Sequence, residues 1–183
     1  MLSQVKPHIL EVLGTFEAPA VTILIDGASG AGKTTLAEEV QNFWPEHRNV
    51  VVIHLDDIYP GWSGLDAASE QVANSFLPAR VDGTDSQYRI WDWVAGEYAE
   101  QRTVSARDDL IIEGCGALSR QAAERADLSI WIDADDSLRR QRALSRGNED
   151  FEAHWDEWDK QFTAFVRREN PQRSASVSVG AKR

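Results

Sequence analysis

The sequence predicts a single α/β domain over residues 1–183, with three layers in which helices cover both sides of a parallel sheet of about five strands. Two observations support this prediction. Short apolar runs alternate along the chain with segments of helical periodicity, and these runs are polar on neither face, as strands buried on both sides are. A chain of 183 residues is also long enough to bury a core without disulfides or metals.

The strand-like runs are short and rich in β-branched residues. They cover residues 20–25, 50–55, 110–112 and 128–132. Between the first two, Leu36, Val40 and Phe43 recur at helical spacing and Pro45 ends the pattern, which predicts a βαβ unit. Near the end of the chain, Val and Ser alternate over residues 173–180, which fits an edge strand or a disordered end, and the alternation favours the strand.

The composition argues against several classes of protein. A formal net charge of -11 disfavours nucleic acid and anionic membranes as partners, because both attract clustered positive charge. Cys115 is the one cysteine, so an intrachain disulfide is excluded and we expect a small packing residue. The N-terminus lacks the apolar core of a signal peptide, and no run approaches the roughly 20 apolar residues of a membrane span. We therefore expect a cytoplasmic protein, whose oligomeric state the composition does not indicate.

Residues 27–34 match the pattern G-x-x-x-x-G-K-[ST] between a predicted strand and a predicted helix. The glycines allow backbone angles that direct successive N–H groups at one phosphate. The helix N-terminus and Lys33 add positive charge, and the Thr34 hydroxyl is suited to ligate magnesium. The segment is therefore predicted to be a phosphate-binding P-loop. Its candidate nucleotide-binding residues are Gly27, Ala28, Ser29, Gly30, Ala31, Gly32, Lys33, Thr34 and Thr35.

Two of the strand-like runs end in carboxylates, Glu113 in one case and Asp56 with Asp57 in the other. Ligands of open α/β sheets bind beyond the carboxyl ends of the strands, so these acids are expected to face the P-loop rather than to be solvated turn residues. Asp56 is the candidate base for an acceptor hydroxyl, and Asp57 is its alternate in the acceptor site. Thr34, Glu113 and Asp56 are the candidate magnesium-binding residues. His54, inside the strand, is expected to be a core histidine.

Arg139, Arg142 and Arg146 are spaced so that they share one helical face. One interpretation is a helical lid near residues 139–160, in which Arg139 contacts the nucleotide while Arg142 and Arg146 offset charge in the transition state. The alternative is an ordinary helix surface paired with nearby acids. Downstream, four aromatic residues at helical spacing predict a packing face rather than a cofactor site. These are Trp155, Trp158, Phe162 and Phe165.

Four segments, taken in order, resemble the uridine kinase family of P-loop small-molecule kinases. They are IDGASGAGKTTLA, HLDDIYPGW, RIWDWVAGEYAEQRTVS and LIIEGCGAL, and the likeness covers about residues 20–179. The resemblance implies a P-loop NTPase fold with a small hairpin at about residues 88–105 over the acceptor site and a helical lid. It also implies ATP and Mg²⁺ as cofactors.

The family's motifs correspond to particular residues of this chain. Its catalytic aspartate corresponds to Asp56, and the tyrosine that helps to hold the nucleoside corresponds to Tyr59. Its Tyr-Asp-Phe segment corresponds to Trp91, Asp92 and Trp93, which the resemblance therefore implies are substrate-binding residues. The alternative for the two tryptophans is a core position on the inward face of a strand.

The chain also departs from the family at positions that choose the acceptor. Gly96 stands where family members carry a histidine that contacts the base, and Trp91 replaces a tyrosine. Arg80 and Arg89 are candidates to meet an anionic acceptor, and Arg89 is counted among the substrate-binding residues. Isolated arginines are otherwise surface residues.

We therefore predict a phosphotransferase that moves the γ-phosphoryl group of ATP to a hydroxyl of a small molecule, a nucleoside being favoured. One alternative is a kinase for a non-nucleoside alcohol or for a nucleotide. The other is a non-catalytic nucleotide-binding switch. GTP is not expected, because no Asn-Lys-x-Asp guanine reader follows the fourth strand-like run.

Overall fold

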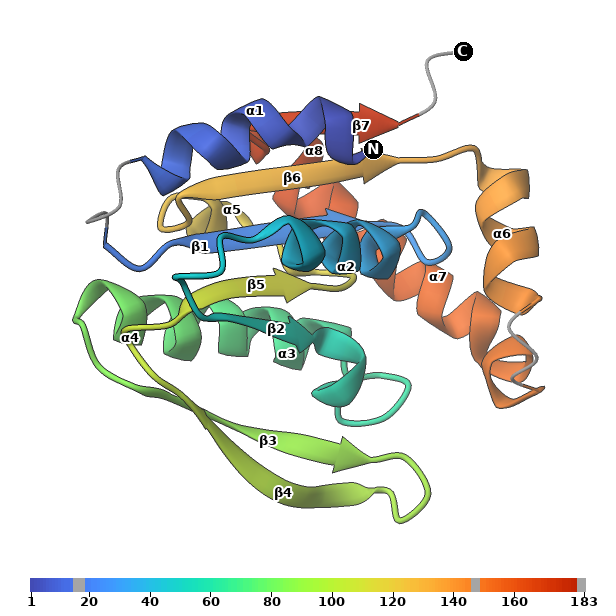
Figure 1. Ribbon diagram of the computed structural model, residues 1–183. Helices are drawn as coiled ribbons and strands as arrows, with labels where there is room; N and C mark the ends of the chain where they lie inside the picture. The colour runs from blue at the N-terminus through green and yellow to red at the C-terminus, as the bar shows by residue number, and fades with distance from the viewer. Residues whose placement is uncertain (15–18, 146–148, 181–183) are drawn as a thin grey trace.

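Helices lie on both sides of a parallel sheet, which confirms the predicted three-layer α/β fold (Figure 1). The computed structural model describes residues 1–14, 19–145 and 149–180. Within these ranges the main sheet has five strands in the order β2-β5-β1-β6-β7, each parallel to its neighbours. The strands are β1 (Thr22–Gly27), β2 (Val50–His54), β5 (Asp109–Glu113), β6 (Leu128–Asp133) and β7 (Val177–Gly180).

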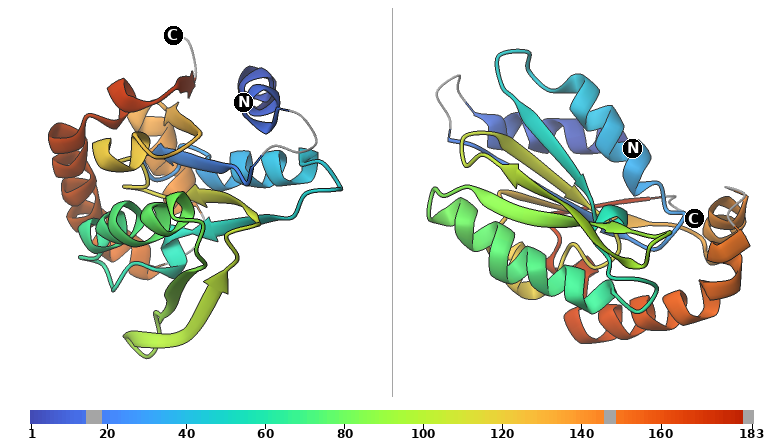
Figure 2. Two further views of the ribbon diagram at one scale, coloured as in Figure 1. Left: turned by 90° about the vertical axis from the view of Figure 1, so that its left-hand side faces the viewer. Right: turned by 90° about the horizontal axis from the view of Figure 1, so that it is seen from below.

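The helices of the described residues divide between the two faces of this sheet (Figure 2). α1 and α2 cover one face, whereas α3, α5 and α7 cover the other. The bounds are α1 (Leu2–Leu13), α2 (Lys33–Phe43), η1 (Leu55–Asp57), α3 (Leu65–Gln71), η2 (Val72–Phe76), α4 (Leu77–Val81), α5 (Arg120–Ala123), α6 (Asp136–Leu144), α7 (Glu149–Glu169) and α8 (Pro171–Ser174).

The central strand β1 shows why the apolar runs are polar on neither face. All of its residues are buried. Ile23 and Ile25 pack into the core beneath α1 and α2, and Leu24 packs into the core on the opposite side. Because successive side chains of a strand point to opposite faces, a strand covered on both sides carries apolar residues on both faces.

The predicted hairpin is present as β3 (Ser86–Asp92) and β4 (Glu97–Val104), which pair antiparallel apart from the main sheet. It begins slightly earlier than the predicted residues 88–105 and projects from the body of the molecule (Figures 1 and 2). Tyr88 and Val104, near its base, are buried in the core beside α3 and η2. The far end is held by one hydrogen bond from Trp93 to the backbone of Asp56.

The segment predicted to be a helical lid, near residues 139–160, contains most of α6 and the first part of α7, and its residues 146–148 lie outside the described residues. The aromatic residues of α7 are buried and form a packing face, as expected, and the ring of Phe162 stacks on that of Trp131 from β6. The alternating Val and Ser residues near the C-terminus form the edge strand β7, parallel to β6, which confirms the strand interpretation. Among the described helices none combines the length and the apolar character needed to cross a membrane.

A buried carboxylate joins the segments at the amino ends of β1 and β5. Asp109 is 1% exposed and accepts hydrogen bonds from the Val21 amide at 2.7 Å and the Trp44 indole at 2.8 Å. Arg48 donates to both of its carboxylate oxygens at 2.6 Å, which forms a bidentate ion pair. The negative charge is therefore compensated on every side, and its removal would leave a largely buried guanidinium and two N–H groups without acceptors.

We predict that Asp109→Ala lowers the free energy of unfolding by about 3 kcal/mol or more, because it leaves the buried Arg48 charge uncompensated. Urea denaturation followed by circular dichroism measures this change. The matched control is Asp108→Ala, which removes a half-buried neighbouring carboxylate and is expected to change stability by less than about 1 kcal/mol. Equal effects of the two substitutions would contradict the role given to Asp109.

Candidate active site

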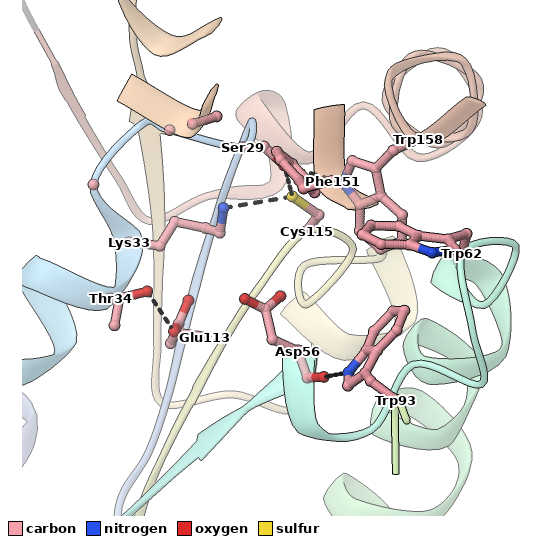
Figure 3. A pocket seen from close by; sticks show the side chains of 13 residues that line it. Ser29, Lys33, Thr34, Asp56, Trp62, Trp93, Glu113, Cys115, Phe151 and Trp158 are labelled. Carbon is pink, nitrogen blue, oxygen red and sulfur yellow. Dashed lines mark hydrogen bonds between the residues drawn. The ribbon is translucent and has the colours of Figure 1, made fainter. Parts of the chain in front are cut away.

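A cavity of about 420 Å³ lies at the carboxyl ends of β1, β2 and β5 (Figure 3). Open α/β sheets bind their ligands at this edge, and the volume is in the range of roughly 300–1,000 Å³ that small-molecule sites occupy. The residues that line it are Ser29, Gly30, Gly32, Lys33, Thr34, Asp56, Trp62, Trp93, Glu113, Cys115, Ala143, Phe151 and Trp158.

The glycine-rich segment is the loop between β1 and α2 and forms one wall of this cavity. Gly30 and Gly32 have φ angles of 79° and 102°, which other residues rarely adopt. α2 begins at Lys33, so the N–H groups of its first turn border the cavity. Of the nine predicted nucleotide-binding residues at 27–35, five line the cavity, namely Ser29, Gly30, Gly32, Lys33 and Thr34, and four do not: Gly27, Ala28, Ala31 and Thr35.

The ammonium group of Lys33 is buried among acidic groups. The residue is 8% exposed, and its Nζ donates to the Ala28 carbonyl at 3.2 Å and to Cys115 Sγ at 3.4 Å. Burial alone would lower the pKa of Lys33, but the surrounding negative groups outweigh it and raise the pKa above its ordinary value. The side chain therefore carries its positive charge at neutral pH at the base of the cavity.

Glu113 ends β5 beside this lysine and is held by two neighbours. Thr34 Oγ1 donates to Glu113 Oε1 at 2.9 Å, and His54 Nδ1 lies 2.7 Å from the same oxygen. Burial would raise the pKa of Glu113, but the hydrogen bond with His54 and the charge of Lys33 lower it. The carboxylate is therefore ionised and lies where a cation beside a bound phosphate would be ligated.

The expectation that His54 is a core residue is wrong. Its side chain is 37% exposed and forms an ion pair with Glu113, and the hydrogen bond to that carboxylate raises the pKa of His54. The reason is the strand register. His54 is the last residue of β2 and pairs with Glu113 across the β2–β5 ladder, so both side chains stand at the open edge of the sheet.

Asp56 lines the cavity from η1, the short helix that follows β2. Its carboxylate points into the cavity between Glu113 and Cys115 (Figure 3). Its backbone carbonyl accepts a hydrogen bond of 2.9 Å from Trp93 Nε1. Asp57 is exposed and does not line the cavity, so the structure brings the first aspartate of the pair to the P-loop and not the second.

Aromatic side chains form the wall opposite the P-loop. Trp62 and Trp93 lie with ring centroids 4.8 Å apart, and Trp62 also packs against Phe151 at 5.7 Å. Trp62 stacks on His154 of α7 with the rings 4.6 Å apart and nearly parallel. Trp158 donates its indole N–H to Ser29 Oγ of the P-loop at 3.0 Å, so α7 contacts the loop directly. Sequence reasoning missed Trp62 and Phe151 as lining residues and placed Trp158 only in the packing face.

Besides Asp57, four predicted substrate-binding residues do not line the cavity. Tyr59 is 1% exposed, and its hydroxyl donates to the Cys115 carbonyl at 2.8 Å, so it supports the cavity from below. Arg89 donates to the Tyr98 carbonyl on the hairpin, and Trp91 packs edge-on against the Tyr98 ring. Asp92 accepts the N–H groups of the two residues at the hairpin turn, Val94 and Ala95. Trp93 is the member of this segment that lines the cavity.

Arg80 was expected to meet an anionic acceptor and Arg139 to contact the nucleotide, but both contact groups of the protein itself. Arg80 donates to the backbone carbonyls of Ser105 and Asp108 and therefore fastens a loop. Arg139 forms ion pairs with Asp136 and Asp159 at 2.7 and 2.9 Å, which agrees with the alternative of a helix surface paired with acids.

Of the other two arginines predicted for the lid, one is described by the structure and the other is not. Arg142 is exposed on α6 and does not line the cavity, whereas its neighbour Ala143 does. Arg146 lies outside the described residues.

Asp26 is a functional neighbour that sequence reasoning missed. It is fully buried at the end of β1 and accepts N–H hydrogen bonds from Gly27, Gly116 and Leu118. Burial raises the pKa of Asp26 to about 6, although these N–H groups and Lys33 act in the opposite direction. The sequence did contain a signal for Asp26, because an acidic residue inside an apolar strand stands directly before the glycine-rich pattern. The residue joins the start of the P-loop to the segment after β5.

A loop of this geometry beside a buried lysine and two strand-end carboxylates defines a P-loop phosphotransferase site. The model of a family described as an AAA domain matches residues 23–161. The uridine kinase of Ureaplasma parvum serovar 3 is 30% identical over 183 residues, covering 87% of each chain. The uridine kinase of Lactobacillus helveticus is 26% identical over 150 residues, covering 74% of this chain and 71% of its own.

Solved structures share the fold of this chain. A possible uridine kinase from Bacillus stearothermophilus superposes with a TM-score of 0.64 at 20% identity, covering 96% of this chain and 97% of its own. A putative fructose transport system kinase from Silicibacter superposes with a TM-score of 0.59 at 16% identity, covering 98% of both chains. The chain thus belongs to the uridine kinase-like family of P-loop kinases, and it is a phosphotransferase with an alcohol group as acceptor.

The buried carboxyl of Asp26 leads to a prediction about pH. Its folded pKa of about 6 lies above the ordinary value of 3.8, so its contribution to stability is fully present below pH 3.8 and is lost as the pH rises through about 6. Over this pH interval, the free energy of unfolding of the wild type should fall by about 3 kcal/mol relative to that of Asp26→Asn. Urea denaturation at a series of pH values measures the difference, and parallel pH profiles for the two proteins would refute it.

A second prediction concerns the contact between the P-loop and α6. A Cβ atom on Gly30 would overlap the backbone carbonyl of Arg139, so Gly30→Ala must displace the loop. We expect nucleotide affinity to fall at least about tenfold, because the N–H groups of the displaced loop would no longer all point at one phosphate. The matched control is Gly96→Ala, which also has a positive φ but meets open space, and should cost about 1 kcal/mol of stability with no loss of nucleotide binding. Calorimetric titration with ATP distinguishes the two, and unchanged affinity in Gly30→Ala would be the contrary result.

Proposed function

We propose that this protein transfers the γ-phosphoryl group of ATP to a hydroxyl of a small acceptor, and that the acceptor is a nucleoside. The observation that carries the proposal is that the P-loop with Lys33, the carboxylate of Asp56 and an aromatic wall face one cavity. A nucleotide and an acceptor bound there would lie side by side between the lysine and the aspartate. The uridine kinase names of the sequence relatives support the choice of a nucleoside.

The P-loop side of the cavity is suited to the triphosphate. Backbone N–H groups of the loop and of the first turn of α2 are donors for phosphate oxygens, and Lys33 supplies a full positive charge. Thr34 and Glu113, already hydrogen-bonded to each other, would hold Mg²⁺ directly or through water, with Asp56 as a further acid nearby.

The donor set fits magnesium rather than an ion held by protein alone. No group of three or more acidic, histidine or cysteine ligands that could hold a metal occurs in the described part of the chain. Magnesium commonly binds through one or two protein oxygens together with water and substrate phosphates, so a sparse set beside the P-loop suits it. When bound, the ion would neutralise charge on the β- and γ-phosphates.

Asp56 has the position of a general base. Its carboxylate enters the cavity from the side opposite to the P-loop helix, where it would orient the acceptor hydroxyl and take its proton (Figure 3). Phosphoryl transfer requires positioning and charge compensation more than covalent catalysis, so no nucleophilic side chain is needed. Ala143 of α6 and Phe151 of α7 limit access of water from the lid side. A role for Arg142 and Arg146 in compensating transition-state charge remains part of the proposal.

The proposal also places the protein in the cytoplasm, a setting supported by a single, buried, unpaired cysteine. Two other functions use the same site differently. A kinase for a non-nucleoside alcohol or for a nucleotide would keep Asp56 but prefer another acceptor. A nucleotide-binding switch would hydrolyse ATP at a rate that no acceptor changes. Turnover measured with and without nucleosides, sugars and vitamin-like alcohols separates the three.

We predict that Asp56→Asn still binds ATP but transfers phosphate at least about a hundredfold more slowly, as removal of a positioned base typically causes. Lys33→Ala should instead lose ATP binding, because the buried cavity loses its cation. Calorimetric titration measures binding and a coupled assay measures transfer. The matched control is Asp57→Asn, an exposed neighbour outside the cavity lining, which should retain activity within about threefold. Near-normal turnover in Asp56→Asn would contradict the assignment of Asp56 as the general base.

A further inference from the structure

The hydroxyl group of Ser29, in the P-loop, is bound by a tryptophan that is far away in the sequence. Trp158 Nε1 donates to Ser29 Oγ at 3.0 Å, and both residues line the cavity (Figure 3). An indole N–H is a donor and has no acceptor function, so the Ser29 oxygen is the acceptor in this contact. The single proton of the hydroxyl is therefore left for a different acceptor.

A weak acceptor for this proton lies nearby. Cys115 Sγ is 3.5 Å from Ser29 Oγ, and the same sulfur accepts from Lys33 Nζ at 3.4 Å. Thiol sulfur accepts hydrogen bonds poorly, whereas a phosphate oxygen carries charge and forms shorter and stronger ones. A phosphate group in the cavity would therefore take the Ser29 proton in preference to the sulfur.

The position of Ser29 relative to Lys33 indicates which phosphate this would be. The hydroxyl and the ammonium group both contact the sulfur of Cys115, so they lie at the same part of the cavity (Figure 3). The lysine of a P-loop reaches the β- and γ-phosphates. The Ser29 hydroxyl is therefore expected beside the outer phosphates, and ADP, which lacks the γ-phosphate, should gain less from it than ATP.

The ring of Trp158 is itself held in place from two directions. The residue is 5% exposed, and its ring packs edge-on against Tyr59 with the centroids 4.7 Å apart. The next residue, Asp159, forms an ion pair of 2.9 Å with Arg139 of α6, whose backbone carbonyl packs against the P-loop. The packing of α7 therefore fixes the indole N–H where it meets Ser29.

We propose that Trp158 is a positioning residue for phosphoryl transfer, because its indole N–H occupies the acceptor function of Ser29 and directs the hydroxyl proton at the γ-phosphate. Ser29 then binds this phosphate through its side chain as well as through the backbone of the loop. The proposal rests on the proposed kinase function and adds a side-chain donor to the P-loop. It also gives α7, a helix distant in the sequence, a direct part in binding ATP.

The first experiment measures the Kd of ATP and of ADP, each with Mg²⁺, by calorimetric titration of the full chain without an acceptor. Ser29→Ala should weaken ATP binding at least about tenfold, as loss of a hydrogen bond to a charged group does, and ADP binding less than about threefold. Trp158→Phe keeps a ring and loses the N–H, so it should weaken ATP binding about three- to tenfold, again with little effect on ADP. A role in packing alone would weaken both nucleotides alike.

The second experiment is a double-mutant cycle on the ratio of the two dissociation constants. Because Trp158 is proposed to act through Ser29, the double variant Ser29→Ala/Trp158→Phe should have the same ratio as Ser29→Ala within about twofold. The matched control is Trp155→Phe, the same change at a buried residue about one turn earlier on α7 and outside the cavity lining. It should keep the wild-type ratio within about twofold. Circular dichroism verifies that each variant is folded.

The outcomes separate this proposal from the kinase function itself. Equal weakening of ATP and ADP in Ser29→Ala or in Trp158→Phe, or independent effects that multiply in the double variant, would overturn the role given to Trp158 and leave the kinase function standing. Hydrolysis of ATP indifferent to every acceptor would overturn the kinase function and, with it, the role of Trp158 in transfer. The titrations need no acceptor, so they still decide whether Ser29 binds the γ-phosphate.

Discussion

A buried positive charge is the constraint on which the site depends. Burial alone would lower the pKa of Lys33 at the base of the cavity, but Cys115 and the carboxylates of Glu113, Asp56 and Asp26 raise it, and those carboxylates come from the segments at the ends of three different strands. Asp26 is the next-to-last residue of β1, Glu113 ends β5 and Asp56 follows β2. Parallel pairing brings these ends to one edge of the sheet. The fold therefore brings the buried positive charge and the acids beside it to the same edge of the sheet.

Packing of α7 against one face of the sheet supplies the aromatic side of the cavity. α7 lies against the core with Phe162 and Phe165, and the same helix directs Trp158 and Phe151 into the cavity. The indole of Trp158 also reaches the P-loop through Ser29. One aromatic face thus stabilises the fold and bounds the acceptor side, so the groups that bind phosphate and those that shape the acceptor site are mechanically joined.

The part of the site that could be predicted from the sequence is the part with local geometry. The P-loop pattern lies within eight consecutive residues, and Glu113 and Asp56 follow recognisable strands, so their positions at one edge of the sheet follow from parallel pairing. Tyr59 was placed by resemblance to the family, and Arg89 was a candidate to meet an anionic acceptor. In this chain Tyr59 is buried in the core and donates to the Cys115 carbonyl, and Arg89 donates to the Tyr98 carbonyl of its own hairpin. Arg139 likewise found acids on α6 and α7.

The sequence by itself determined the α/β class, the parallel sheet, the phosphate-binding loop and the strand-end acids, since each of these depends on residues that are near one another along the chain. Tertiary structure alone decided that His54 pairs with Glu113, that Asp26 is buried beneath the loop, and which tryptophans face the cavity. Those outcomes depend on strand register and on how a hairpin and a distant helix pack over the sheet edge. Periodicity along the chain describes which face of an element is apolar, but it does not state what that face will meet.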